Sequence, residues 1–241
     1  MEKTVLLFSG GLDSMLLEYI TNPDVLLYVD MKTSYSGVEI LSLRTLPKSY
    51  KDRIKIVSLP LTEYERGNKY LPYRNLLLGT IAMQYGQHIY FGFNSTDCAP
   101  DKDKVFLRRL NYLFKHLNKN SIADMGWESK NFSFSAPLVK YTKSEAIKKC
   151  LRKGMDVELI RNIRTCYDSI SVKGCGVCPV CLRKAVALLS NDISIEGLFD
   201  VPITKADILK EFNVIQENIR NGEYYPKNYL KEWEYACRTA K

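Results

Sequence analysis

Short apolar, β-branched runs alternate with helical patterns over the first two-thirds of the chain. The apolar runs predict strands at Thr4–Phe8, Val25–Asp30, Ile54–Leu59, Ile89–Phe93 and Phe132–Ala136. Between them, apolar residues at three- and four-residue spacing predict helices over Ser14–Ile20, Arg74–Tyr85 and Asp103–Leu117. Strands that alternate with helices form parallel sheets covered by helices on both faces, so we expect an α/β, doubly wound, mostly parallel sheet.

Length and composition narrow the class of protein further. The 241 residues fit one large domain, or a domain with a small appendage. No apolar run approaches the ~20 residues that cross a bilayer, and the run before Ser9 is too short for a signal-peptide core, so we expect a cytoplasmic protein with no membrane partner. The net charge of +8 favours anionic ligands without indicating nucleic acid. Only two histidines occur, which argues against histidine-centred hydrolase chemistry.

Most of the predicted elements after residue 141 are helices. Thr142-Lys143-Ser144-Glu145 is a capping-box pattern that begins a helix with Cys150 on its apolar face, where we expect core packing. Further helices are predicted over Asp156–Ile163, from near Leu182 onward, over Thr204–Asn221 and over Pro226–Arg238. We therefore divide the chain into an α/β domain at 1–165, a cysteine-rich region at 166–203 and a helical extension at 204–241.

A glycine loop follows the first predicted strand and reads Ser9-Gly10-Gly11-Leu12-Asp13-Ser14. Two glycines let the backbone turn tightly and bring its N–H groups close to phosphate oxygens, and the following helix adds positive potential. The two serines can donate hydrogen bonds, and Asp13 can hold Mg²⁺ against a pyrophosphate. The loop is neither a Walker A sequence nor a dinucleotide-binding fingerprint. The alternative is an ordinary Gly-Gly turn.

Four of the seven cysteines lie within sixteen residues, in the pattern C-x8-C-x2-C-x2-C. Cys166, Cys175, Cys178 and Cys181 suit a tetrahedral, structural Zn²⁺, with Gly174, Gly176 and Pro179 supplying the turns. An iron–sulfur cluster is the alternative, because C-x2-C-x2-C also begins a ferredoxin run. That run would place its fourth cysteine at position 185, which is Ala185.

Together, the glycine loop and the cysteines show a family resemblance. The loop is similar to the pyrophosphatase loop of the adenylating superfamily that includes asparagine synthetases, ammonia-dependent NAD synthetases and tRNA-thiolating enzymes. Between about Val5 and Leu188 the chain resembles the 7-cyano-7-deazaguanine synthase family of queuosine precursor biosynthesis. The residues that carry the resemblance are Phe8–Ser14, Leu71-Pro72-Tyr73-Arg74-Asn75, Gly92-Phe93-Asn94, Asp97, Pro100-Asp101-Lys102, Pro137-Leu138, Lys143, Glu145, Cys166-Tyr167 and Cys175-Gly176-x-Cys178-x-x-Cys181-x-Arg183.

This resemblance implies a fold of the adenine-nucleotide α-hydrolase type and an ATP-dependent C–N ligase. The family converts 7-carboxy-7-deazaguanine and ammonia to the nitrile through adenylated intermediates, with release of AMP and pyrophosphate. It implies Mg²⁺ with ATP, structural Zn²⁺, small-molecule substrates and a homodimer, with no requirement for nucleic acid. The residues implied for ATP are Phe8, Ser9, Gly10, Gly11, Leu12, Asp13 and Ser14, of which Asp13 and Ser14 are catalytic. The residues implied for the substrate are Arg74, Asn75, Asp97, Asp101 and Lys102.

The sequence also departs from the family pattern. After Asp30, where the family has Tyr-Gly-Gln-Arg-His, this chain reads Met31-Lys32-Thr33-Ser34-Tyr35. Two other functions therefore stay open: a related adenylating enzyme that makes a deazaguanine amide or conjugate or modifies tRNA, and a nucleotide-binding module without catalysis. The aromatic and basic residues of the extension could stack on bases, although packing on the domain or across a dimer explains them more simply.

Overall fold

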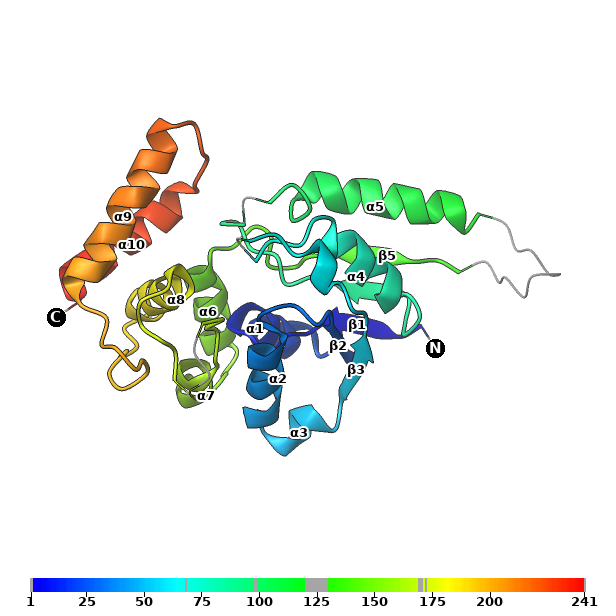
Figure 1. The fold of residues 1–241 in the computed structure, drawn as a ribbon, viewed down its shortest axis with the longest axis horizontal. Coiled ribbons are helices and arrows are strands. Elements are labelled where there is room, and N and C mark those ends of the chain that lie inside the picture. Colours follow the sequence, from blue (N-terminus) through cyan, green and yellow to red (C-terminus); the bar gives the residue numbers. More distant parts are fainter. Residues whose placement is uncertain are drawn as a thin grey trace.

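A five-stranded sheet, parallel throughout, forms the centre of the computed structural model, which describes residues 2–67, 69–97, 99–119, 130–168, 171 and 173–240. The strand order is β3-β2-β1-β4-β5 (Figure 1). The strands are β1 (Thr4–Leu7), β2 (Val25–Asp30), β3 (Ile54–Ser58), β4 (His88–Tyr90) and β5 (Ser133–Ser135). All five predicted strands are present, and β4 differs most, because it ends at Tyr90 rather than at Phe93. The predicted α/β class is confirmed.

Helices cover both faces of this sheet. Successive side chains of a strand point to opposite faces, so Leu6 and Leu26 enter one core while Val5 and Leu27 enter the other. In Figure 1, α4 and α5 lie on one side of the sheet and α2 and α3 on the other. The helices before the cysteines are α1 (Leu12–Thr21), α2 (Ser36–Thr45), α3 (Lys48–Lys51), α4 (Arg74–Ala82), α5 (Lys104–Leu117), α6 (Lys143–Arg152) and α7 (Val157–Asn162), with a 3-10 turn η1 (Thr62–Tyr64).

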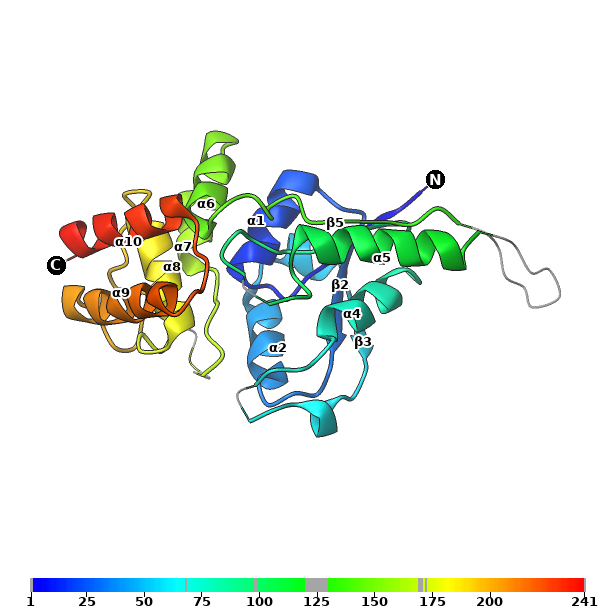
Figure 2. The same ribbon diagram turned by 90° about the horizontal axis from the view of Figure 1, so that it is seen from above.

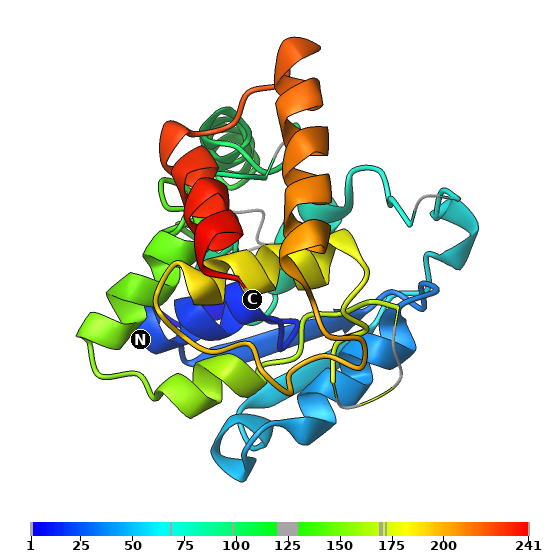
Figure 3. The ribbon, with the colours of Figure 1, turned by 90° about the vertical axis from the view of Figure 1, so that its left-hand side faces the viewer.

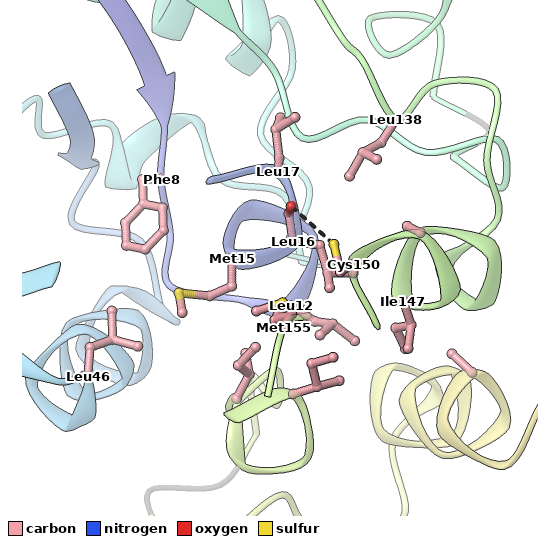
Figure 4. Packing of buried hydrophobic residues seen from close by; sticks show 14 of the residues in the cluster. Phe8, Leu12, Met15, Leu16, Leu17, Leu46, Leu138, Ile147, Cys150 and Met155 are labelled. Carbon is pink, nitrogen blue, oxygen red and sulfur yellow. Dashed lines mark hydrogen bonds between the residues drawn. The ribbon is translucent and has the colours of Figure 1, made fainter. Parts of the chain in front are cut away.

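The first helix is buried in the core that Figure 4 shows. Met15 and Leu16 of α1 pack among side chains from β1 and α6. Cys150 of α6 is fully buried there and its thiol donates to the Leu16 carbonyl oxygen over 3.5 Å, which confirms its predicted packing role. The core therefore holds α1, and with it the glycine loop, against the sheet.

Two helices were not predicted. Helix α2 begins with Ser36 and Gly37, and its N-cap residue, Tyr35, makes no side-chain capping bond. The apolar residues of α2 also do not gather on one face of the helix. Packing of Leu43 and Leu46 in the core stabilises this region instead. The short α3 follows directly, after Pro47. Another difference is that α4 ends at Ala82 rather than at Tyr85.

The C-terminal helices share a third core with the cysteines. They are α8 (Pro179–Leu189), α9 (Lys205–Arg220) and α10 (Lys227–Thr239), and Figures 2 and 3 show α9 and α10 packed on α8. The rings of Phe212 and Trp233 stack between α9 and α10, with centroids 6.2 Å apart. Tyr229 and Trp233 are thus core residues, as the packing interpretation predicted. In the described part of the chain, no helix combines the length and apolar character needed to cross a membrane.

Candidate functional site

The site lies where the order of the strands reverses. From β1 the chain builds outward to β2 and β3, then crosses back so that β4 and β5 lie on the other side of β1. The carboxyl ends of β1 and β4 therefore leave a crevice between them, the usual ligand position in such sheets. Two cavities lie there, and Ser9, Asp13, Ser14, Glu39 and Tyr167 line both of them.

The glycine loop forms the floor of both cavities. Gly10 has a φ of +72°, and a Cβ at this position would lie 2.9 Å from the side chain of Leu43 on α2, so the turn requires glycine. Gly11 is the N-cap of α1 and supplies no side-chain capping bond. Helices leave their first N–H groups without an intrahelical partner. The start of α1 is therefore suited to an anion.

Asp13 is the carboxylate of this loop, and it is held by a lysine from a distant helix. Its Oδ2 lies 2.5 Å from Nζ of Lys143, the first residue of α6. Its Oδ1 is buried and has no hydrogen-bond partner among the described residues. Buried polar atoms almost always have partners. This oxygen is therefore suited to bind a cation such as Mg²⁺, which prefers oxygen ligands.

Arg164 adds a second cation to the cavity beside the glycine loop. The side chain is 5% exposed; its Nη1 donates to the Val38 carbonyl oxygen over 3.1 Å and its Nε to the Ser171 carbonyl oxygen over 2.9 Å. Within the described residues, its Nη2 has no partner. Lys143 and Arg164 together make this cavity suitable for phosphate groups. Sequence reasoning assigned Arg164 no role, because nothing near it in the chain resembles an anion site.

Four of the five predicted substrate residues line the larger cavity: Arg74, Asn75, Asp97 and Lys102. Asp97 and Lys102 form an ion pair of 2.9 Å, and Asp97 also accepts from the Asn94 backbone.

Asp101, the fifth, does not line either cavity. It accepts from the backbone N–H of Asn75 over 3.3 Å, and its carbonyl oxygen accepts from the Asn75 side chain over 3.2 Å. The structure therefore places Asp101 at the start of α4, where it holds Asn75.

Of the predicted loop residues, Phe8, Ser9, Asp13 and Ser14 line the larger cavity. Gly11 and Leu12 line the smaller one. Gly10 lines neither and serves the turn.

A half-buried polar cluster around Glu39 of α2, a helix that was not predicted, completes the wall of the larger cavity. Glu39 accepts from the Tyr28 hydroxyl over 3.0 Å, and the Arg74 guanidinium donates to the Tyr35 hydroxyl over 3.3 Å. The rings of Tyr35 and Tyr167 lie 5.3 Å apart. Burial raises the pKa of the Glu39 carboxyl to about 7, although the hydrogen bond from Tyr28 and the charge of Arg74 act against this. A carboxyl with a perturbed pKa in a cleft is typical of functional sites.

Glu39→Gln is expected to stabilise the free protein at high pH. The folded state holds the Glu39 proton more tightly than the unfolded chain, in which the carboxyl pKa is 4.5. Protonated Glu39 therefore contributes its full stabilisation below pH 4.5, and this stabilisation is lost as the pH rises through about 7. Glutamine keeps the bond from Tyr28 without the charge. We expect its unfolding free energy to exceed wild type by about 2 kcal/mol at about pH 8, with the difference vanishing toward pH 4.5. Urea unfolding across this range measures it. Glu63→Gln, on the surface, is the control, and equal pH profiles for Glu39→Gln and wild type would contradict the prediction.

The four cysteines of the predicted metal site lie close together next to the smaller cavity. Their sulfurs all lie within 4.8 Å of one another, with 4.0 Å between those of Cys166 and Cys178 and 3.8 Å between those of Cys175 and Cys181. Four thiolates around one Zn²⁺, each at about 2.3 Å, lie about 3.8 Å apart. A hydrogen bond from Cys181 lowers the pKa of Cys178 below its ordinary value, which favours the thiolate. The cluster is therefore compatible with a structural metal.

The turns around the sulfurs explain the neighbouring glycines. Gly176 has a φ of +83°, and a Cβ there would lie 1.9 Å from the Val201 carbonyl oxygen. A Cβ on Gly174 would lie 2.9 Å from the sulfur of Cys181. The segment that enters the cluster, Thr165–Tyr167, also lines the cavity beside the glycine loop. The cysteine cluster and the candidate active site thus share a wall.

Comparisons with known proteins agree with this arrangement. The family model described as Queuosine biosynthesis protein QueC matches residues 29–192. The chain is 26% identical over 172 residues to the 7-cyano-7-deazaguanine synthase of Ruthia magnifica, covering 68% of each chain. It is also 26% identical over 231 residues to the synthase of that name from Rickettsia prowazekii, covering 80% of this chain and 97% of the relative. The matched residues contain the cysteines and Glu39, whereas the glycine loop and the last two helices lie outside the family model.

Proposed function

The chain belongs to the queuosine biosynthesis protein QueC family, as the sequence resemblance predicted, and from this premise we propose that it is an ATP-dependent 7-cyano-7-deazaguanine synthase. Its substrates would be 7-carboxy-7-deazaguanine, ammonia and ATP. The observation that carries the ATP-dependent part is the glycine loop, with the uncapped start of α1 and the pair of Asp13 and Lys143 beside two cavities. The smaller, cationic cavity suits the phosphates, and the larger one suits the bases.

The first step would activate the carboxylate. A carboxylate oxygen of the substrate attacks the α-phosphorus of ATP, the bond from that phosphorus to the bridging oxygen breaks, and pyrophosphate leaves with the electron pair. The N–H groups at the start of α1 and the ammonium of Lys143 would stabilise the charge on the departing pyrophosphate. Bound Mg²⁺ would neutralise phosphate charge, and the buried Oδ1 of Asp13 is the atom suited to hold it.

The later steps would form the nitrile. Ammonia attacks the acyl carbon, loses a proton and displaces AMP to give the amide. The amide oxygen then attacks a second ATP, with loss of another pyrophosphate. Loss of AMP and of the remaining N–H protons leaves the C≡N bond. No strong base is required, so orientation and charge stabilisation supply most of the rate. The carboxyl ends of the strands and the ring of Tyr167, which packs on Tyr35, are suited to that orientation.

Mass spectrometry of the product tests this function. The purified protein is incubated with ATP, Mg²⁺, ammonia and 7-carboxy-7-deazaguanine, and with each component omitted in turn. We expect 7-cyano-7-deazaguanine, with two AMP and two pyrophosphate for each nitrile. An amide or adduct would instead favour the related adenylating enzyme. No consumption of ATP would favour the non-catalytic module, and ADP with phosphate would reject the adenylation mechanism.

A further inference from the structure

The last helix of the chain reaches the helix that carries Lys143. Glu232 of α10 accepts a hydrogen bond from the hydroxyl of Thr142, the N-cap of α6. Thr142 is 1% exposed, so this contact is shielded from water. A second residue of α10, Asn228, donates to the Glu145 carboxylate over 2.9 Å. Residues beyond the family match therefore contact both members of the α6 capping box.

The capping box is already complete without α10. The Glu145 N–H donates to the Thr142 hydroxyl over 3.1 Å, and the Thr142 N–H donates to the Glu145 carboxylate over 2.9 Å. The hydroxyl proton of Thr142 is the group that Glu232 binds. Glu232 thus adds no cap to the helix; it fixes the direction of the capping side chain and ties the start of α6 to α10.

The arrangement has an electrostatic cost. Burial, together with the neighbouring Glu145 carboxylate, raises the pKa of Glu232 to about 7, although the bond from Thr142 acts against this. Two carboxylates converge on one helix start, where a single one would satisfy the capping box. A contact that carries such a cost and lies next to the site is more easily explained by positioning than by stability.

The start of α6 is also where the site is built. Lys143 follows Thr142 directly, and its Nζ lies 2.5 Å from Oδ2 of Asp13. From the other side, Asn191 donates to the Ser144 carbonyl oxygen over 3.1 Å. Thr142 and Ser144, on either side of Lys143, are thus held by α10 and by the turn that follows α8. A shift of α6 would move the lysine relative to the glycine loop.

We propose that Glu232 is a positioning residue, through which the C-terminal extension holds the start of α6 so that Lys143 stays paired with Asp13. The catalytic consequence rests on the proposed function, because Lys143 matters only if pyrophosphate leaves at the glycine loop. In this arrangement the C-terminal extension, residues 204–241, helps to position the side chains of the site. Its aromatic residues anchor α10, and Glu232 transmits that anchoring to Lys143.

Three variants of α10 test the proposal. Glu232→Ala removes the acceptor, Glu232→Gln keeps one, and Tyr235→Phe is the matched control, because it removes a bond from α10 to Asp192 that does not reach α6. We expect Glu232→Ala to lower kcat for pyrophosphate release by roughly 10- to 100-fold, with KM for ATP within about 2-fold of wild type. Glu232→Gln should restore most of kcat, and Tyr235→Phe should retain all of it.

A double-mutant cycle separates positioning from a general loss of structure. In a Lys143→Met background, Glu232→Ala should cause no further loss, because Glu232 acts through Lys143. Additive losses would overturn the proposal, as would full activity of Glu232→Ala.

Hydrogen exchange tests the contact without relying on activity. In Glu232→Ala, the amides of Glu145 and Ala146, which donate to Thr142, should exchange about 10-fold faster, with α9 unchanged. If the wild type releases no pyrophosphate, the proposed function fails, and unchanged exchange in Glu232→Ala would then refute the positioning role separately.

Discussion

Replacing Asp13 by alanine is expected to abolish release of pyrophosphate from ATP, with a loss of about 10³-fold or more. The buried Oδ1 has no partner among the described residues, and Oδ2 holds Lys143. The substitution removes both a cation ligand and the partner that fixes the lysine, each of which would stabilise transition-state charge by several kcal/mol. Pyrophosphate release measured by a coupled assay, with AMP followed by chromatography, gives the loss directly.

Asp13→Asn separates charge from shape in the same experiment. Asparagine fills the same space but carries no charge to hold Mg²⁺ or the Lys143 ammonium. We expect it to be nearly as inactive as alanine while remaining folded, because the amide keeps the shape of the side chain and its oxygen can still accept a hydrogen bond from the Lys143 ammonium. Release of pyrophosphate within about tenfold of wild type in Asp13→Ala would show that the carboxylate has no such function.

The second large effect is expected from the cysteine cluster, which we predict to hold one Zn²⁺ per chain. Cys178→Ser should abolish stoichiometric zinc and lower the stability of the C-terminal region by several kcal/mol, because metal binding and folding of such a site are coupled. Cys178 is also the N-cap of α8, so loss of the metal loosens the helix on which α9 and α10 pack. Activity should fall as a consequence, because Thr165–Tyr167 lines the cavity beside the glycine loop.

Cys237→Ser is the matched control for the metal. Cys237 packs against the same core from α10 but does not belong to the tetrad. This variant should keep its zinc and nearly all of its stability. Elemental analysis and thermal unfolding compare the two variants, and the visible spectrum tests the alternative cluster. Stoichiometric iron with absorption near ~400 nm would reject zinc, and a metal-free Cys178→Ser of unchanged stability would reject the structural role.

Features that depend on neighbouring residues could be predicted from the sequence alone. The five strands, the glycine loop and the Thr142–Glu145 capping box are all present where predicted. Each depends on local backbone preference or on side chains within a few residues. The cysteine cluster could also be predicted, because the tight spacing of Cys175, Cys178 and Cys181 brings these three side chains close together.

Contacts between residues far apart in the chain could not be predicted from local patterns. Helix α2 has no strong local signal and forms because Leu43 packs in the core, yet it supplies Glu39. The structure also places Asp101 outside both cavities. There it contacts Asn75 at the start of α4. Lys143 reaches Asp13 from 130 positions away, and Glu232 reaches Thr142 from 90. Such contacts depend on how the sheet order and the helix packing bring separate segments together, and no local pattern in the chain encodes that convergence.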